Sequence, residues 1–184
     1  MAAATRERAL EAAVEVLGTD GVRALSHARV DQRAGLPAGS TSNWFRTRRA
    51  LLAGIIDWMA ELERADFTPE LLEQPTPDSI AEGLCAVLLV QTGPAATRTR
   101  ARYALFVELA ADPELLEPLR RQRREFEEWT DRLVAAAGIP DPVPAARALM
   151  ALGDGLALHR LTVDPELDVR PAVERAVLAL AATG

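Results

Sequence analysis

Apolar residues recur at helical spacing from one end of this chain to the other. Near the start, Leu10, Ala13 and Leu17 follow the i, i+3, i+7 pattern of a single helix face. Similar apolar stripes continue to the end of the chain, separated by Gly, Pro and Asp. No segment shows the alternation of apolar and polar residues that is typical of a strand. The pattern predicts an all-α protein of about nine helices, over residues 6–17, 27–34, 37–45, 48–65, 78–91, 95–111, 113–137, 143–161 and 169–182, with a loop over 67–77.

Residues 26–52 carry the signals of two short helices joined by a tight turn, with another helix directly behind them. Ser26 can cap the first helix by accepting a backbone N–H bond. Gly35 supplies the left-handed backbone that ends a helix, and Pro37 fits the first turn of the next one. This order predicts a helix-turn-helix, whose second helix, 37–45, can enter the major groove of DNA.

The predicted second helix has an inner and an outer face. Thr41 and Phe45 are four residues apart and can both point inward. Small, polar and aromatic side chains are left on the outside: Ala38, Gly39, Ser40, Ser42, Asn43 and Trp44. Thr47 can cap the following helix, whose first turn carries Arg48 and Arg49. Cations there oppose the helix dipole, and contact with a phosphate backbone would reverse that cost.

The charge of the chain is divided unevenly along its length. The net charge is −6, which is unusual for a protein that binds DNA. Residues 1–50, however, hold eight Arg and five acidic residues, whereas the other 134 residues hold thirteen Arg and 22 acidic residues. The basic end is therefore the helix-turn-helix end, as phosphate binding requires. The acidic remainder discourages DNA binding elsewhere.

Composition limits the remaining classes of protein. A single cysteine excludes an internal disulfide, and no cluster of ligands suggests a zinc site or another cofactor. The N-terminus becomes charged too early for a secretion signal, and no apolar run is long enough to cross a bilayer. We therefore expect a cytoplasmic protein without a membrane partner, associated with the nucleoid when it binds DNA.

The first quarter of the chain resembles the TetR family of bacterial transcription regulators. The order and spacing of many residues match the family's DNA-binding domain without a gap: Thr5, Arg6, Glu7, Arg8, Leu10, Ala12, Ala13, Gly21, Ser26, Arg33, Ala34, Gly35, Gly39, Ser40, Phe45, Ala50 and Leu51. The resemblance implies a helix-turn-helix DNA-binding domain over residues 1–47. It also implies a helical ligand-binding and dimerisation domain over 48–184.

The resemblance assigns roles to individual positions. It implies that five residues lie near phosphates: Ser26, Ser40, Ser42, Trp44 and Arg48. It further implies that the start of the second helix comes closest to the base edges: Pro37, Ala38 and Gly39. The chain departs from the family, which often has a basic or polar residue at Ala38, a large aliphatic residue at Thr41, Tyr at Ser42, and His or Tyr at Trp44. The operator sequence therefore cannot be inferred.

The last two predicted helices are apolar almost all round. An apolar helix pair in so short a chain favours packing against the same pair of a second chain, as a two-fold four-helix bundle. Burial inside the chain's own domain is the alternative, but helix-turn-helix modules usually bind paired half-sites as dimers. The residues predicted for this dimer interface are Leu149, Leu152, Gly153, Leu156, Val173, Val177 and Leu180.

Large apolar and aromatic side chains of the middle helices have two interpretations. They can form an ordinary core, or they can line a pocket for a small molecule, which the family resemblance implies for this region. The candidate pocket residues are Trp58, Met59, Leu84, Leu88, Tyr103, Phe106, Phe126 and Trp129. For any single one of these residues, the core interpretation is the safer one.

Four further features have a structural and a functional interpretation. His27 is expected to be exposed to solvent, and a phosphate contact is the alternative. His159 is expected in a core or interface rather than in catalysis, and Cys85 is expected to be a small buried hydrophobe rather than a redox sensor. The arginines of 120–124 find acidic residues four positions on, which favours a self-paired, solvated helix face over a second DNA site.

Together these patterns predict a homodimeric, ligand-responsive DNA-binding regulator rather than an enzyme. We expect a repressor that binds a near-palindromic operator and is released by an apolar or amphipathic molecule. Two alternatives stay open: a small helical enzyme or carrier with an accessory DNA-binding module, and a DNA-binding protein with no effector. The chain has no paired catalytic carboxylates, nucleophile elbow, or Gly-rich phosphate loop.

Overall fold

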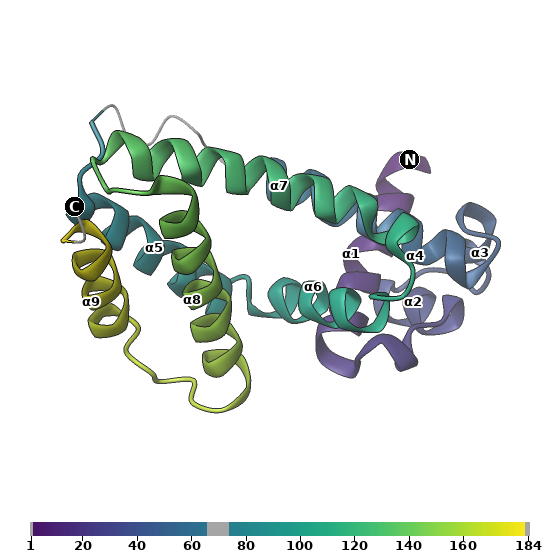
Figure 1. Cartoon of the computed structure of the whole chain (residues 1–184). Coiled ribbons are helices and arrows are strands. Elements are labelled where there is room, and N and C mark those ends of the chain that lie inside the picture. The colour runs from purple at the N-terminus through teal and green to yellow at the C-terminus, as the bar shows by residue number, and fades with distance from the viewer. Residues whose placement is uncertain (1, 66–73, 183–184) are drawn as a thin grey trace. The chain divides into compact units, whose positions relative to one another are not determined.

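The computed structural model describes residues 2–65 and 74–182 (Figure 1), and most of the loop predicted over 67–77 lies outside these residues. The described residues form nine α-helices and one 3-10 helix, with no strand, so the all-α prediction is confirmed. The elements are α1 (Ala2–Asp20), η1 (Val22–Ala24), α2 (His27–Ala34), α3 (Ser40–Trp44), α4 (Arg48–Ala65), α5 (Pro77–Thr92), α6 (Ala96–Glu108), α7 (Pro113–Ala136), α8 (Pro142–Thr162) and α9 (Arg170–Ala181).

Two helices differ from their predicted bounds for identifiable reasons. α1 does not stop before Gly18 but continues to Asp20, because Gly18 packs against α6 and the chain first turns left-handed at Gly21 (φ 82°). α3 begins at Ser40 rather than Pro37, because Gly39 adopts a left-handed conformation (φ 87°) directly before it. Helix interiors were thus predicted better than their first and last turns.

The helices form two compact units, which are described separately. Unit 1 contains residues 1–66 and 96–122, and unit 2 contains residues 67–95 and 123–184. The division expected after residue 47 falls inside unit 1, because α4, α6 and the first half of α7 pack with the N-terminal helices.

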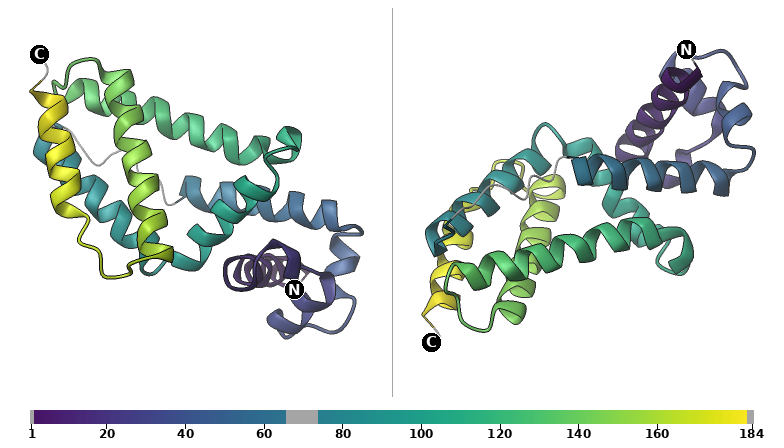
Figure 2. Two further views of the ribbon diagram at one scale, coloured as in Figure 1. Left: turned by 60° about the horizontal axis from the view of Figure 1, so that its bottom comes forward. Right: turned by 90° about the horizontal axis from the view of Figure 1, so that it is seen from above.

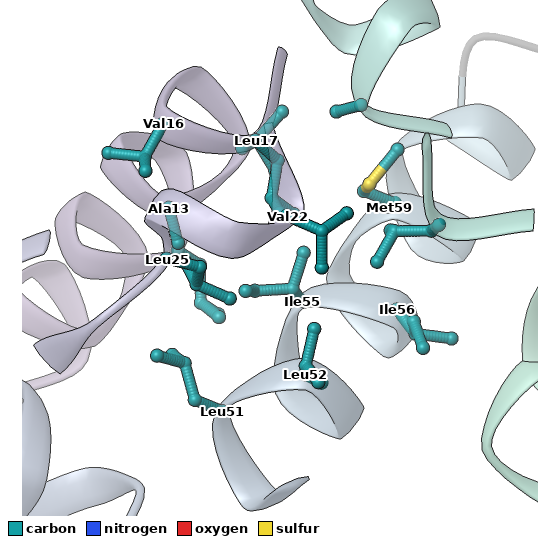
Figure 3. Close-up of a cluster of buried hydrophobic side chains, with 14 of the residues drawn as sticks. Ala13, Val16, Leu17, Val22, Leu25, Leu51, Leu52, Ile55, Ile56 and Met59 are labelled. Atoms are coloured by element: carbon teal, nitrogen blue, oxygen red, sulfur yellow. The ribbon is translucent and has the colours of Figure 1, made fainter. Parts of the chain in front are cut away.

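Unit 1 is built around a continuous apolar core from α1, η1, α4, α6 and α7 (Figure 3). Leu17, Leu51 and Ile55 have at most 2 % of their surface exposed, and each such side chain contributes roughly 1.5–3 kcal/mol through burial. α6 is tied to α4 by a hydrogen-bonded ion pair between Arg102 Nη1 and Glu63 Oε1, at 3.2 Å. These contacts hold α1 and α4 as a firm base for the short helices α2 and α3.

The backbones of α1 and α6 come very close together at Gly18 in unit 1. A Cβ atom placed on Gly18 would lie 2.1 Å from the carbonyl oxygen of Thr97, which is closer than atoms can stand. Only glycine therefore permits the two backbones to meet at this point. This explains why a helix-weakening residue occurs inside α1.

In unit 2, α5 packs against α8 and α9 (Figure 2). Cys85 and Leu88 of α5 and Val173 and Val177 of α9 are almost fully buried. Burial raises the pKa of the Cys85 thiol, in keeping with the predicted role of a small buried hydrophobe. Arg160 braces the far end of α8 by donating from Nε to the Thr92 hydroxyl, at 2.9 Å.

No single helix among residues 2–65 and 74–182 is long and apolar enough to cross a membrane. Within these residues, only α5 and α6 taken together pass that test, and they are two separate helices with a break between them. Within the same residues, no group of three or more His, Cys, Asp or Glu side chains is arranged to hold a metal ion.

Candidate nucleic-acid interface

The local signals of the predicted helix-turn-helix are confirmed around α2. The Ser26 side chain accepts a hydrogen bond from the N–H of Arg29 at 3.3 Å, which caps the helix. At the other end, Gly35 is left-handed (φ 61°) and its N–H donates to the Gln32 carbonyl at 3.3 Å. α2 is thus a short helix with defined ends, followed by a tight turn.

The turn into α3 differs from the predicted geometry. Pro37 precedes the helix, and its carbonyl accepts from both the N–H and the hydroxyl of Ser40, at 3.1 Å and 2.6 Å. Residues 37–39 therefore form a turn, not the first helical turn. The hydroxyl of Ser42 donates back to the Gly39 carbonyl at 2.9 Å, which closes the start of α3.

A buried carboxylate that sequence reasoning did not single out holds the start of α3. Asp31, on α2, is only 3 % exposed. Its Oδ2 accepts from the N–H of Gly39 at 2.8 Å, and its Oδ1 accepts from the N–H and the hydroxyl of Thr41 at 2.8 Å and 2.5 Å. Thr41 is fully buried, as predicted. One signal in the sequence could have revealed this role. Position 41 holds the polar Thr41, whereas the family that the chain resembles often has a large aliphatic residue there, and an inward-facing Thr needs a polar partner such as Asp31.

The end of α3 is held from two directions. Phe45 is buried, as predicted, with its ring against Gly54 of α4 and the Arg6 guanidinium 5.6 Å from the ring centroid. His27 Nε2 lies 2.6 Å from the Phe45 carbonyl oxygen and must donate to it, because a carbonyl can only accept. The prediction of a solvent-exposed His27 is wrong. The side chain is half-buried, because this hydrogen bond draws it against the end of α3.

Most residues predicted to contact DNA are exposed on unit 1. Ser40 is half-buried, and the exposed ones are Ser26, Pro37, Ala38, Gly39, Ser42, Asn43, Trp44 and Arg48. Trp44 is 43 % exposed, although large apolar side chains are normally covered. The outward face of α3 is thus free for a partner, and the individual DNA contacts stay predictions.

The arginines around α3 differ in whether their guanidinium groups already form hydrogen bonds or ion pairs within the protein. Arg48 donates from Nη2 to the Val22 carbonyl at 2.7 Å and from Nη1 to the Leu25 carbonyl. Arg49 pairs with Asp112, which also caps α7 by accepting from the N–H of Leu115 at 3.2 Å. Arg46, by contrast, is exposed and has no hydrogen bond or ion pair within the described residues. Sequence reasoning chose Arg48 and missed Arg46.

The predicted pocket residues are divided equally between the two units. In unit 1, Met59 belongs to the buried core, Trp58 and Phe106 pack against it, and the ring of Tyr103 lies 5.3 Å from the Arg102 guanidinium. The buried Nε1 of Trp58 has no hydrogen-bond partner within the described residues.

In unit 2, the predicted pocket residues are Leu84 and Leu88 of α5 and Phe126 and Trp129 of α7. Leu88 is buried, and a Cβ on Gly153 would meet the Leu84 side chain at 3.3 Å. The rings of Phe126 and Trp129 stack with their centroids 5.6 Å apart. The role of these residues in a ligand pocket stays a prediction.

The predicted dimer residues lie mainly inside unit 2. Leu149, Gly153, Val173 and Val177 are buried, facing inward in a bundle in which α5 packs on both α8 and α9. Three others are half-buried: Leu152, Leu156 and Leu180. The exposed face of α8 instead carries a stripe of small and aliphatic residues at intervals of three and four: Ala148, Ala151, Gly155 and Leu158.

The chain was compared with known proteins and structures. The family model described as "Tetracyclin repressor-like, C-terminal domain" matches residues 75–183. No curated protein matches the chain. The structure of a TetR family member from Streptomyces coelicolor is 27 % identical, with 96 % of this chain and 98 % of that chain covered and a TM-score of 0.72.

Two further solved structures cover nearly the whole chain. A transcriptional regulator from Streptomyces coelicolor is 25 % identical, with 97 % of this chain and 99 % of that chain covered and a TM-score of 0.71. The multidrug binding protein EbrR, solved in complex with ethidium, is 29 % identical, with coverages of 96 % and 98 % and a TM-score of 0.65. EbrR has also been solved with proflavin.

Proposed function

Because the chain belongs to the TetR family of transcriptional regulators, we propose that it is a ligand-responsive repressor that binds a near-palindromic operator as a homodimer. The observation that carries this proposal is the exposed face of α3, which is rigidly backed and carries Ser42, Asn43 and Trp44. Hydroxyl, amide and indole groups can all contact base edges or phosphates in a major groove. The protein acts in the cytoplasm.

Each subunit places α3 in a major groove, and the two grooves lie roughly 34–36 Å apart along the duplex. Arg46 supplies a phosphate contact at the end of the helix, because its guanidinium is exposed and uncommitted. Arg48 acts mainly within the protein, where it ties α4 to the carbonyls of Val22 and Leu25. This division of roles differs from the assignment made by resemblance.

The dimer forms through α8 and α9, with the exposed stripe of α8 at its centre. Small side chains such as Ala151 and Gly155 let the backbones of two helices approach closely, and Leu158 and Leu178 supply apolar area at the edges. Leu158 is 50 % exposed and Leu178 is 61 % exposed in the single chain. Exposed leucines beside a small-residue stripe are what a self-complementary interface needs.

The effector is an apolar or amphipathic molecule, and an aromatic one is favoured. EbrR, a relative of similar fold, binds ethidium and proflavin, which are both flat aromatic molecules. This chain has the stacked Phe126 and Trp129 in unit 2, and in unit 1 the buried Trp58 indole N–H can donate to a ligand acceptor. The residues predicted for the pocket are retained as proposed ligand contacts within each unit separately: Trp58, Met59, Tyr103 and Phe106 in unit 1, and Leu84, Leu88, Phe126 and Trp129 in unit 2.

Effector binding reaches the DNA-binding helices through α6. This helix follows α5 after three residues, packs on α1 at Gly18 and is paired with α4 through Arg102. A shift of α6 must therefore move α1 or strain that contact. A coupling of about 1–3 kcal/mol between the two sites would change operator affinity by roughly 5- to 150-fold.

The proposal is tested with labelled duplexes that cover the intergenic DNA beside this gene. Fluorescence anisotropy should find one fragment bound far more tightly than the others, with two chains per duplex and affinity falling steeply with salt. The Trp44→Ala variant tests the exposed face of α3, and it should fold normally but lose selectivity. Equal, weak binding to every fragment by the wild-type protein would refute the proposal.

A further inference from the structure

α2 presents two polar side chains to the two ends of α3. His27 and Asp31 are four residues apart, so they lie on the same face of α2, one turn from each other. Asp31 contacts the start of α3 and His27 contacts its end. Neither contact is part of the usual apolar packing between the two helices of this motif.

At the start of α3, one carboxylate satisfies two backbone donors and one hydroxyl. The N–H groups of Gly39 and Thr41 would otherwise be unsatisfied, because the first N–H groups of any helix have no partner within it. Asp31 therefore acts as a cap supplied by a neighbouring helix. Hydrogen bonds to an ionised acceptor are stronger than neutral ones, and this carboxylate is shielded from water.

At the end of α3, the imidazole of His27 satisfies a carbonyl that has left the helix. Phe45 is extended (φ −126°, ψ 92°), and its carbonyl oxygen points to Nε2 of His27 at 2.6 Å. This bond fixes the direction in which the chain leaves α3 and the position from which the Phe45 ring docks on Gly54.

The length of α3 makes these two contacts decisive. The helix contains five residues, and so short a helix cannot hold its own shape in water. Its inward packing comes from Thr41, which is fully buried, and from Phe45 just after it. The orientation of the exposed residues between them therefore depends on what holds the two ends.

We propose that His27 and Asp31 are positioning residues for DNA recognition, which together form a two-point clamp that sets the orientation of α3 in the major groove. This proposal rests on the proposed function for its effect on DNA, although the clamp itself is a property of the free protein. It also assigns His27 a role in positioning instead of direct contact with DNA.

The clamp has a consequence for how phosphates are bound. In many proteins, the free N–H groups at a helix N-terminus bind an anion. In α3 the N–H groups of Gly39 and Thr41 already bind Asp31, and that of Ser40 binds Pro37. These three N–H groups are therefore not available to a phosphate, and side chains beside α3 supply contacts in their place. Arg46 is a cation at this position that has no hydrogen bond or ion pair within the described residues.

Amide hydrogen exchange in the free protein tests the clamp without DNA. In Asp31→Asn the amide oxygen can still accept from Thr41, but its NH₂ group cannot accept from Gly39. We expect the Gly39 N–H to exchange about ten- to a hundredfold faster, while amides in the middle of α1 are unchanged. Thr41→Val, which replaces the hydroxyl with a methyl group and keeps the backbone N–H, provides a second variant should Asp31→Asn fold poorly. It should raise exchange at position 41. Asp57→Asn, an exposed change on α4, is the matched control.

Affinity for DNA tests the positioning role. The probes are a duplex selected by the wild-type protein from a random pool and a scrambled duplex of the same composition. Asp31→Asn and His27→Phe should weaken binding to the selected duplex at least about tenfold, and to the scrambled one less than about threefold, because phosphate contacts persist. His27→Gln, which keeps a donor near the position of Nε2, should restore most of the selectivity.

The outcomes separate the clamp from the proposed function. Unchanged exchange at Gly39 and Thr41 in the variants would overturn the clamp. Equal losses on both duplexes, in variants that circular dichroism shows to be folded, would overturn the positioning role. If the wild-type protein selects no duplex, the proposed function fails, and the exchange rates alone decide whether the clamp exists.

Discussion

The ring of Phe45 occupies the space in which a side chain at Gly54 would stand. A Cβ on Gly54 would lie 2.3 Å from Cε1 of that ring, well inside contact distance. Phe45 directly follows α3 and Gly54 lies in the middle of α4, so this contact docks the DNA-binding helix on the helix that follows it. The absence of a side chain on Gly54 thus sets how closely α3 approaches the core of unit 1.

We predict that Gly54→Ala destabilises the protein by about 1–3 kcal/mol, because the added methyl group overpacks the contact with Phe45. The matched control is Gly83→Ala on α5, where an added Cβ meets nothing within 4 Å. That change should stabilise the protein by up to about 1 kcal/mol, because alanine favours a helix. Urea unfolding measures both, and equal effects of the two variants would contradict this account of Gly54.

A second glycine substitution tests the contact between α1 and α6. Gly18→Ala places a methyl group against the backbone oxygen of Thr97, which cannot move as a flexible side chain can. We expect a loss of at least about 2 kcal/mol in the free energy of unfolding, at the upper end of overpacking costs. If Gly18→Ala lowers the free energy of unfolding no more than Gly83→Ala does, then α1 and α6 can move apart without cost. The contact at Gly18 would then not hold α6 in place.

The ion pair between Arg49 and Asp112 predicts a dependence of stability on pH. The hydrogen bond from Arg49 lowers the pKa of Asp112, and the N–H of Leu115 lowers it further. A carboxylate with a lowered pKa stabilises the fold above its unfolded pKa of about 3.9, and that stabilisation is lost as pH falls through the lower, folded value. Arg49 is exposed and Asp112 is only half-buried, so solvent screens the pair and the effect is small.

Asp112→Asn removes the negative charge but keeps the helix cap, because the asparagine side-chain oxygen can still accept the hydrogen bond at the start of α7. Its free energy of unfolding should lie below that of the wild-type protein at pH 7. The difference should start to shrink as pH falls below about 4, where the unfolded chain takes up the proton, and should vanish below the lower pKa of the folded state. Thermal or urea unfolding at several pH values measures it, and a difference that is the same at every pH would rule out the charge as its cause.

The two arginines beside α3 should respond differently to removal. Arg46→Ala should weaken binding to every duplex and reduce the salt slope of log Kd by about one, with no change in stability. Arg48→Ala should lower stability, because two backbone carbonyls lose their donor. Binding titrations over a salt series and urea unfolding of both variants separate the two roles. An unchanged slope in Arg46→Ala speaks against its contact with phosphate.

The proposed dimer face can be tested with paired charge substitutions. Leu158→Glu places a charge at the edge of the α8 stripe and should convert the dimer to a monomer in sedimentation equilibrium. Val107→Glu, on α6, changes a side chain that is 79 % exposed and lies outside the proposed interface. It should leave the dimer intact. Dissociation by both, or by neither, would remove the reason for placing the interface on α8.

The sequence alone predicted the helices well because their signals are local. Apolar spacing, the Ser26 and Thr47 caps, and the left-handed Gly35 each act within a few residues, and the structure has all of them. The bounds of α4 agree with their prediction at both ends. Even the inward direction of Thr41 and Phe45 followed from their spacing alone.

What the sequence did not predict depends on contacts between distant residues. The role of Asp31 requires α3 to lie beside α2, and the engagement of Arg48 requires η1 and Leu25 to lie beside the start of α4. The predicted interface residues Val173 and Val177 are buried because α5 packs on α9, a pairing that no periodicity in α9 could reveal. Periodicity shows which face of a helix is apolar, but not which helix will cover it.

The central claim is that two copies of α3 read DNA in successive major grooves, and selection from a random duplex pool tests it most directly. The wild-type protein should enrich an inverted repeat whose half-site centres lie one or a small number of helical turns apart, at about 10–10.5 base pairs per turn. Asn43→Ala, on the exposed face of α3, should alter the bases within each half-site and leave that spacing unchanged. Enrichment of no repeat, or of the same half-sites by both proteins, would contradict the claim.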